Sequence, residues 1–154
     1  MKYLSRIKRA YIAGFLDGDG SIYIRLKPNS DYRFGYQVSP NIVFYQSLKN
    51  LSFLAKIKRI IEEGYIRKRN DGVAEYVLGD KASMVSLIEQ ILPYLILKKK
   101  QAKLFLKILE KKEMIKSKKD FLKLAELIDN LEKLNYSKKR IITSRVVSNN
   151  FKKL

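Results

Sequence analysis

The chain has 154 residues, of which 33 are Lys or Arg and 15 are Asp or Glu, so its formal net charge is +18. With 46% hydrophobic residues, it is long and apolar enough for one folded domain, which we expect to span residues 1–154. Cysteine and histidine are both absent, which excludes disulfides, thiolate metal sites and chemistry based on histidine.

The positive charge favours a polyanionic partner, and nucleic acid is the partner we expect. A solvated lysine-rich surface is the alternative interpretation, and charge does not separate DNA from RNA or a binding protein from an enzyme. No apolar run approaches the roughly 20 residues of a membrane span, and the basic N-terminal segment lacks the apolar core of a signal peptide. We therefore expect an intracellular protein that is not secreted, has no membrane partner, and lies with DNA in a prokaryotic cytoplasm or an organelle.

The first elements predicted along the chain are a helix and two strands. Residues 6–17 have the apolar spacing of a short helix. The stretch SIYIRLK then alternates apolar and polar residues, which predicts a half-buried strand, and Pro28 and Asn29 begin a turn. A second alternating strand runs to Phe44, and Pro40 within it predicts a bulge or an edge position.

A second helix and a second hairpin follow. The segment QSLKNLSFLAKIKRIIEEG is amphipathic, so we expect a helix that stops at Gly64. The stretches YIRKR and VAEYVLG are joined by Asn-Asp-Gly at residues 70–72, which is typical of a hairpin turn. From Lys81 onward the pattern is helical, with a break at Pro93.

The remaining sequence predicts a helix that begins at Lys98 and two more over residues 118–134 and 137–150. The order of elements is therefore helix, hairpin, helix, hairpin and then several helices. This order predicts an α+β fold, with one antiparallel four-stranded sheet backed by helices and with further C-terminal helices.

The sheet face that helices do not cover combines basic side chains with Gln, Asn, Ser and Tyr, which hydrogen-bond base edges in the major groove. A solvated sheet face is usually inert, whereas this composition favours a face that reads DNA. The candidate DNA-binding residues of the sheet and its turns are Ser21, Tyr23, Arg25, Lys27, Asn29, Arg33, Gln37, Ser39, Asn41, Arg67, Arg69 and Glu75, and the candidate phosphate contacts of the last helix are Lys138, Lys139 and Arg140.

The stretch IAGFLDGDG places two glycines in a helix that then ends in acid. Gly14 and Gly18 share one helix face with Ala10, so a second helix could approach closely, although packing against the chain's own sheet is the alternative. Asp17 and Asp19 lie at the negative end of the helix dipole, where a cation would compensate their charge. From the residues alone, a divalent metal site and a solvated turn remain equally open.

The same stretch resembles the signature of the LAGLIDADG homing endonucleases over residues 12–20. The resemblance continues collinearly through the KPN turn, GYIRKR, EYVL and LPYLILKKKQA, and so covers roughly residues 10–150. These blocks are similar to the single-motif branch, which a Chlamydomonas chloroplast intron enzyme typifies. The resemblance implies an αββαββα-like fold, double-stranded DNA as the substrate, and a homodimer whose subunits pair through Ala10, Gly14 and Gly18.

The resemblance also implies a role for each residue that matches the family. Asp19 is the metal-binding acid, assisted by the main-chain carbonyl of Gly18, while Asp17 is mainly structural. Gln46 orients the water shell around the metals, and Lys98 lies near the attacking water and the phosphate. The ion implied is Mg²⁺, for which Mn²⁺ would substitute, whereas Ca²⁺ would bind without supporting cleavage.

The resemblance implies an intron-encoded, site-specific endonuclease that hydrolyses one phosphodiester per strand across the minor groove and leaves 3′ overhangs. Because strands and DNA have similar rises per residue and per base pair, we expect a partly two-fold target of roughly 20 base pairs. Ser47 and Asn50 depart from the basic residues of close relatives, which leaves the turnover open. The alternatives are a maturase that binds intron RNA and a non-catalytic DNA-binding regulator of the same fold.

Overall fold

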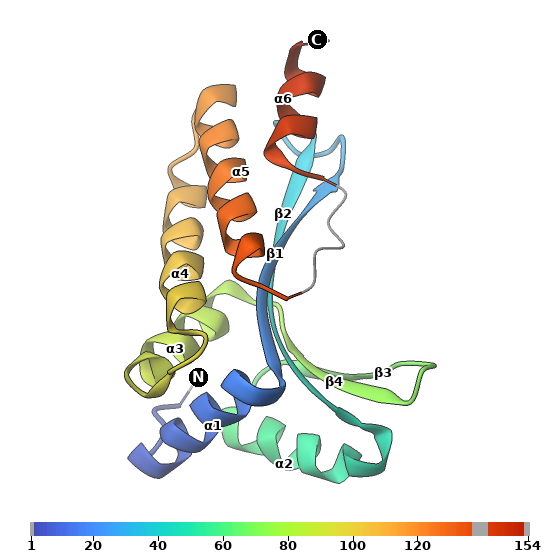
Figure 1. Cartoon of the computed structure of the whole chain (residues 1–154), viewed down its shortest axis with the longest axis vertical. Helices are drawn as coiled ribbons and strands as arrows, with labels where there is room; N and C mark the ends of the chain where they lie inside the picture. The colour runs from blue at the N-terminus through green and yellow to red at the C-terminus, as the bar shows by residue number, and fades with distance from the viewer. Residues whose placement is uncertain (1, 137–141, 153–154) are drawn as a thin grey trace. The chain divides into compact units, whose positions relative to one another are not determined.

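The structure is a computed structural model that describes residues 2–136 and 142–152 (Figure 1). Its four strands form one antiparallel sheet in the order β1-β2-β4-β3, which confirms the predicted α+β class. Within the described residues, no helix is long and apolar enough to cross a membrane. The elements are α1 (Arg6–Asp19), β1 (Gly20–Pro28), β2 (Tyr36–Ser47), a 3₁₀ turn (Leu48–Asn50), α2 (Leu51–Ile61), β3 (Tyr65–Lys68), β4 (Val73–Leu78), α3 (Lys81–Ile91), a 3₁₀ turn (Leu92–Tyr94), α4 (Lys99–Glu113), α5 (Lys118–Lys133) and α6 (Ser144–Lys152).

The chain divides into two compact units. The first unit comprises Met1–Ile22 and Asn41–Ala102, and it contains α1, α2, α3, β3, β4 and the second half of β2. The second unit comprises Tyr23–Pro40 and Lys103–Leu154, and it contains the other parts of β1 and β2 with most of α4, α5 and α6. A single domain over the whole chain stays a prediction.

An aromatic stack holds α1 against the sheet in the first unit. Phe44 on β2 is fully buried, and its ring centroid lies 5.2 Å from that of Phe15 on α1 and 5.8 Å from that of Tyr76 on β4. Phe15 also meets the edge of Phe53 on α2 at 5.1 Å. Offset and edge-to-face contacts of this kind are favourable beyond the apolar area they bury, so the stack fixes the position of the motif helix.

The junction between α1 and β1 requires glycine because the chain passes from helix to strand without a loop. A Cβ at Gly20 would lie 2.4 Å from Leu16 Cδ1 and 2.7 Å from the Leu16 carbonyl oxygen. The Gly20 N–H donates to this same carbonyl and closes the last turn of the helix. The tight junction leaves Asp19 as the last helical residue, at the end of α1.

The second unit packs a hairpin against its C-terminal helices. The side chains of Tyr36 and Val38 on β2 are buried, as the alternation predicts. The ring of Phe121 on α5 lies 5.4 Å from Phe34, 6.0 Å from Tyr36 and 6.0 Å from Phe151 on α6, measured between centroids. These contacts join both helices to the hairpin.

Several details of the predicted elements change. The second helix begins at Leu51, because β2 continues to Ser47 and a 3₁₀ turn follows it. β2 lies between β1 and β4 in the sheet, but its pairing with β4 runs only from Ile42 to Ser47, so Pro40 lies outside that ladder, consistent with a local edge position. The last helix begins at Ser144 instead of residue 137, and Thr143 and Asp129 supply hydrogen-bond acceptors at its start. Residues 137–141 lie outside the described part of the chain.

We predict that Phe44→Ala lowers the free energy of unfolding by about 3–5 kcal/mol, because it leaves a cavity between α1 and β4. Urea unfolding followed by circular dichroism measures this change. Phe44→Leu, the control, fills most of the space and should cost less. Equal losses for the two variants would show that the stack does not carry the packing of α1.

Candidate active site

Asp19 and Gln46 meet where α1 and β2 end, although 27 residues separate them in the sequence. The Gln46 Nε2 donates to Asp19 Oδ2 at 3.3 Å. The Gln46 Oε1 accepts from the side chain of Asn50 at 3.0 Å and from the Ser47 N–H at 3.2 Å, so the amide is held at both ends. The structure therefore brings together two of the three predicted catalytic residues and adds Asn50, which orients Gln46.

Asp17 connects the motif helix to the segment before α4. Its carboxylate accepts the main-chain N–H groups of Ile96 at 2.7 Å, Leu97 at 3.2 Å and Lys98 at 2.9 Å. The Lys98 Nζ in turn donates to the main-chain carbonyl of Asp17 at 2.5 Å. Both carboxylate oxygens of Asp17 are thus engaged by the protein, whereas the side chain of Asp19 is exposed.

Lys98 is a buried ammonium group beside two carboxylates. The residue is 8% exposed, and burial lowers the pKa of its side chain below the ordinary lysine value, while Asp17 and Asp19 partly offset this shift. A lysine with a lowered pKa gives up its proton more readily than one in water. Lys98 thus lies close to both acids of the motif.

The donor atoms at the end of α1 are oxygens, which fits a hard divalent cation. Asp19 offers a carboxylate and Gly18 a main-chain carbonyl, and Mg²⁺ prefers such ligands in a six-coordinate shell. Among the described residues, no group of three or more His, Cys, Asp and Glu side chains could hold a metal. Asp19 and Gly18 provide fewer than six ligands, so water or phosphate oxygens would complete the shell.

The predicted contact face of α1 is exposed in the described part of the chain. Gly14 and Gly18 are exposed, and no atom of the described residues outside the local helix lies within 4 Å of a Cβ built on either. The alternative that these glycines pack against the chain's own sheet is therefore wrong. Ala10 is exposed on the same face, and Ile7 and Tyr11 beside it are 82% and 51% exposed.

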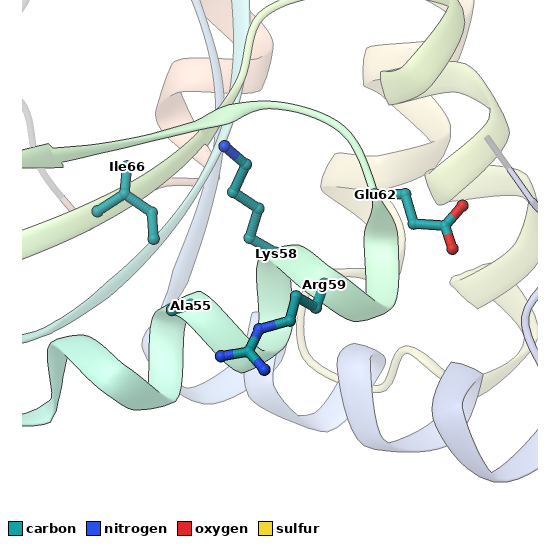
Figure 2. A pocket seen from close by; sticks show the side chains of 5 residues that line it. All are labelled: Ala55, Lys58, Arg59, Glu62 and Ile66. Atoms are coloured by element: carbon teal, nitrogen blue, oxygen red, sulfur yellow. The ribbon is translucent and has the colours of Figure 1, made fainter.

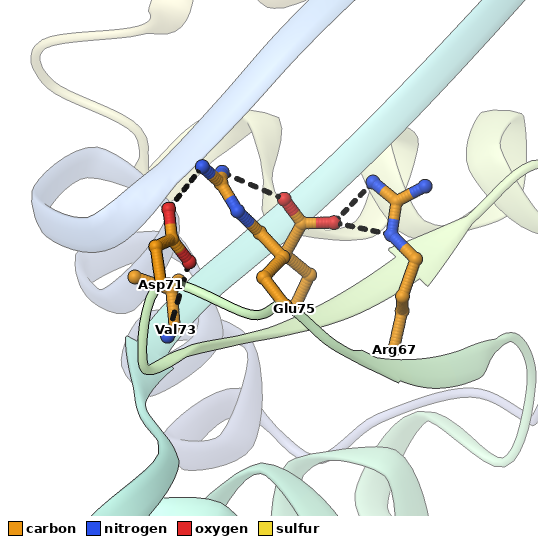
Figure 3. Close-up of polar contacts among 5 residues, drawn as sticks. Arg67, Asp71, Val73 and Glu75 are labelled. Carbon is orange, nitrogen blue, oxygen red and sulfur yellow. Dashed lines mark hydrogen bonds and ion pairs between the residues drawn. The ribbon is translucent and has the colours of Figure 1, made fainter.

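In the first unit, the arginines predicted to read DNA lie in an ion-pair cluster (Figure 3). Glu75 on β4 lies directly opposite Arg67 on β3 and accepts from its Nε at 2.7 Å and from its Nη2. Arg69 donates to Glu75 at 3.2 Å and to Asp71 at 2.5 Å. Glu75 is only 4% exposed, so it holds the two guanidinium groups instead of facing solvent.

The other predicted DNA-binding residues are exposed or half-buried. In the second unit, the guanidinium group of Arg25 lies 4.9 Å from the ring centroid of Tyr23, and the Asn29 side chain accepts the Asp31 N–H at 2.9 Å in the turn. Lys138, Lys139 and Arg140 lie outside the described residues. The exposed positions are Arg25, Lys27 and Arg33, and the half-buried ones are Ser21, Tyr23, Asn29, Gln37, Ser39 and Asn41.

A pocket between α2 and β3 was not predicted from the sequence (Figure 2). It is lined by Ala55, Lys58, Arg59, Glu62 and Ile66. Figure 2 shows that its three charged side chains point in different directions, so they do not converge on one ligand. This pocket therefore provides no catalytic constellation.

The motif helix, the four-stranded sheet and the helices packed with it define the LAGLIDADG class of proteins. The LAGLIDADG endonuclease family matches residues 12–110, and the chain belongs to this family. DNA endonuclease I-CreI of Chlamydomonas reinhardtii is 40% identical over 138 residues, which are 89% of this chain and 84% of that protein. DNA endonuclease I-CvuI of Chlorella vulgaris is 37% identical over 149 residues, 97% of this chain and 92% of that protein.

Solved structures agree with these relations. I-CvuI in complex with the I-CreI target matches with a TM-score of 0.90 and 36% identity, over 96% of this chain and 94% of that one. I-SmaMI bound to cleaved DNA matches in fold alone, with a TM-score of 0.75, 21% identity, and coverage of 99% of this chain but 50% of that one. The predicted family, single-motif branch and fold are confirmed, while the roles of individual site residues stay predictions.

We predict that Asp17→Asn increases the hydrogen-exchange rates of the Ile96, Leu97 and Lys98 amides by roughly tenfold or more, because a neutral amide accepts these hydrogen bonds less strongly than a carboxylate. Amide exchange followed by NMR measures this effect without DNA. Amides in the middle of α3 provide the internal control. Unchanged exchange at all three positions would show that Asp17 does not hold the segment.

Proposed function

We propose that the chain is an intron-encoded, site-specific endonuclease that cuts both strands of a long DNA target across the minor groove and leaves 3′ overhangs. The observation that carries the proposal is the pairing of Asp19 with Gln46 in a member of this family, with Lys98 held by Asp17 in the same unit. The relatives I-CreI and I-CvuI are both DNA endonucleases, and I-CvuI forms a complex with a DNA target. These relatives support DNA as the substrate.

Each residue of the site has a distinct part in the proposed reaction. Asp19 and the Gly18 carbonyl would hold Mg²⁺, which when bound helps to ionise the attacking water and neutralises charge on the phosphate oxygens. Gln46, fixed by Asn50, presents its amide beside Asp19 and orients water there. Lys98 carries the positive charge that faces the phosphate, and Asp17 keeps it in place.

Divalent ions present with the DNA complexes of a relative support a divalent metal as the cofactor. I-CvuI was crystallised with uncleaved DNA at 2 mM Mg and with its own target at 2 mM Ca. We propose Mg²⁺ as the working ion and Mn²⁺ as a substitute. Ca²⁺ would occupy the site without supporting cleavage, since it is larger and prefers a more flexible shell.

We propose that two copies of the chain pair through α1. The chain carries one motif, and its exposed Gly14, Gly18, Ile7 and Tyr11 form an apolar face with small residues at its centre. Small residues permit the close approach of a second helix. The match with I-SmaMI supports pairing as well, because this chain aligns with only half of that longer protein, which leaves room for a second copy.

We predict that Asp19→Asn abolishes cleavage, with less than about one-thousandth of the activity remaining, while affinity for the target changes little, because the carboxylate is needed to hold the ion and not to read DNA. Selection of cut sites from a randomised DNA library with Mg²⁺ first defines the target. Cleavage and binding of that target are then measured for each variant.

The control for this variant is Glu89→Gln, an equal change of charge at an exposed position of α3. It should cut normally. Removal of divalent ions with a chelator should stop the wild-type reaction, and Mn²⁺ should restore it. Cleavage by Asp19→Asn at the wild-type rate would show that Asp19 is not the metal-binding acid.

We predict that Gly14→Leu weakens dimerisation and cleavage while the lone chain stays folded. A side chain at this position meets no described neighbour, and leucine is more favourable than glycine in a helix by about 1 kcal/mol. Analytical ultracentrifugation reports the assembly, and Gly14→Ala is the graded control with a smaller effect. A wild-type protein that sediments as a monomer both free and on DNA would contradict the pairing.

A further inference from the structure

The ion pairs on the second hairpin form a neutral cluster within a strongly basic chain. The cluster consists of Arg67, Arg69, Asp71 and Glu75 (Figure 3), two guanidinium groups and two carboxylates, so its formal charge is zero. The hydrogen bonds that Arg69 donates to Asp71 and Glu75 raise its pKa above the ordinary arginine value. The cluster thus offers hydrogen-bond donors without net attraction for phosphate.

Arg69 is held from two sides. Its Nη2 donates to Asp71 and its Nη1 to Glu75, so two of its five N–H groups are committed to the protein. Its side chain is still 45% exposed, and it keeps donors for a base edge. An arginine fixed in this way has lost the freedom to turn toward the DNA backbone.

Backbone contacts and base contacts differ in what they add to binding. Contacts with phosphates supply affinity for any sequence and depend steeply on salt, whereas contacts with base edges specify the sequence. A mobile, uncompensated arginine is attracted to the nearest phosphate. A fixed and compensated one gains only when a base presents matching acceptors, such as the O6 and N7 of guanine.

We propose that Asp71 is a positioning residue that determines specificity: it fixes Arg69 toward the base edges and cancels its attraction for phosphate. This inference rests on the proposed function and on the expectation from the sequence that the sheet face reads DNA. Asp71 acts through Arg69 and need not touch DNA. It reduces general affinity for nucleic acid and increases discrimination between sequences.

The contact of Asp71 with Arg69 can be tested separately from its hydrogen bond in the turn. Its Oδ1 also accepts the Val73 N–H at 3.4 Å, and an asparagine keeps that acceptor and suits the same turn. Glu75 is a poorer target for mutation, because it is buried and shared by both arginines. Asp71→Asn therefore removes the charge of one of the two carboxylates that hold Arg69, with the least change to the hairpin.

The test is a base-by-base affinity profile of the selected target, measured with Ca²⁺ in place of Mg²⁺ at two salt concentrations. Arg69→Ala first identifies the base positions that Arg69 reads. At those positions Asp71→Asn should lower the preference for the correct base roughly three- to tenfold. Its affinity for random DNA should rise at low salt, and the slope of log affinity against log salt should steepen by up to about 1 per chain.

The control is Asp31→Asn, which removes the same charge from the turn between β1 and β2. Among the described residues, the Asp31 carboxylate makes no ion pair. This control should steepen the salt dependence without changing the preference at the positions read by Arg69. Asp71→Ser, which keeps an acceptor for the Val73 N–H, should repeat the effect of Asp71→Asn, and melting temperatures confirm that each variant folds.

Three outcomes would overturn the inference. One is an unchanged preference profile in both Asp71 variants, and a second is a uniform loss of affinity for all sequences. The third is an equal loss of preference in Asp31→Asn, which would assign the effect to charge alone. A wild-type protein with no sequence preference would instead refute the proposed function, so the two failures are distinguishable.

Discussion

The arrangement of the site depends on the hydrogen bonds between the Asp17 carboxylate and three successive main-chain N–H groups. They join the end of the motif helix to a segment about eighty residues later in the chain. Because Lys98 belongs to that segment, a single carboxylate decides where the buried ammonium lies relative to Asp19. The first acid of the motif thus positions Lys98, and the second acid is left exposed.

The packing beneath the site explains why these groups can be placed so closely. The stack of Phe15, Phe44 and Tyr76 fixes α1 on the strands, and Gly20 removes any loop between the helix and β1. Gln46 follows Phe44 by two residues on β2, so the stack that positions the helix also positions the amide beside it. Apolar packing and polar geometry are therefore coupled through one strand.

Much of the fold follows from the sequence because each element has a clear apolar period. The two hairpins and the four-stranded sheet formed as predicted, and the amphipathic helix formed but begins at Leu51 instead of near Gln46. The strand order itself was not predictable, since it depends on long-range pairing that a local pattern does not contain. The apolar periodicity likewise did not locate the start of the last helix. Thr143 and Asp129 accept hydrogen bonds from N–H groups at that start.

The predicted site residues were found from the family motif, whereas their supporting contacts were not predictable. Asn50 looked like a departure from the family, yet it holds Gln46, and Asp71 looked like a turn residue, yet it holds Arg69. Such contacts depend on side-chain rotamers and on neighbours brought together by folding. The ion pairs of the second hairpin had one signal in the sequence, because acidic residues stand among its arginines. A carboxylate near two cations is expected to pair with them.

The exposed helix face around Gly14 and Gly18 has a consequence for how activity depends on the concentration of the chain. In an enzyme that cuts only as a pair, the amount of active species at low expression grows with the square of the chain concentration, so halving the supply lowers activity about fourfold. In the proposed pair each copy contributes one Asp19, so an unpaired copy would lack the second. If the exposed face of α1 mediates this pairing, the nuclease would be nearly silent in a cell that makes very little of it.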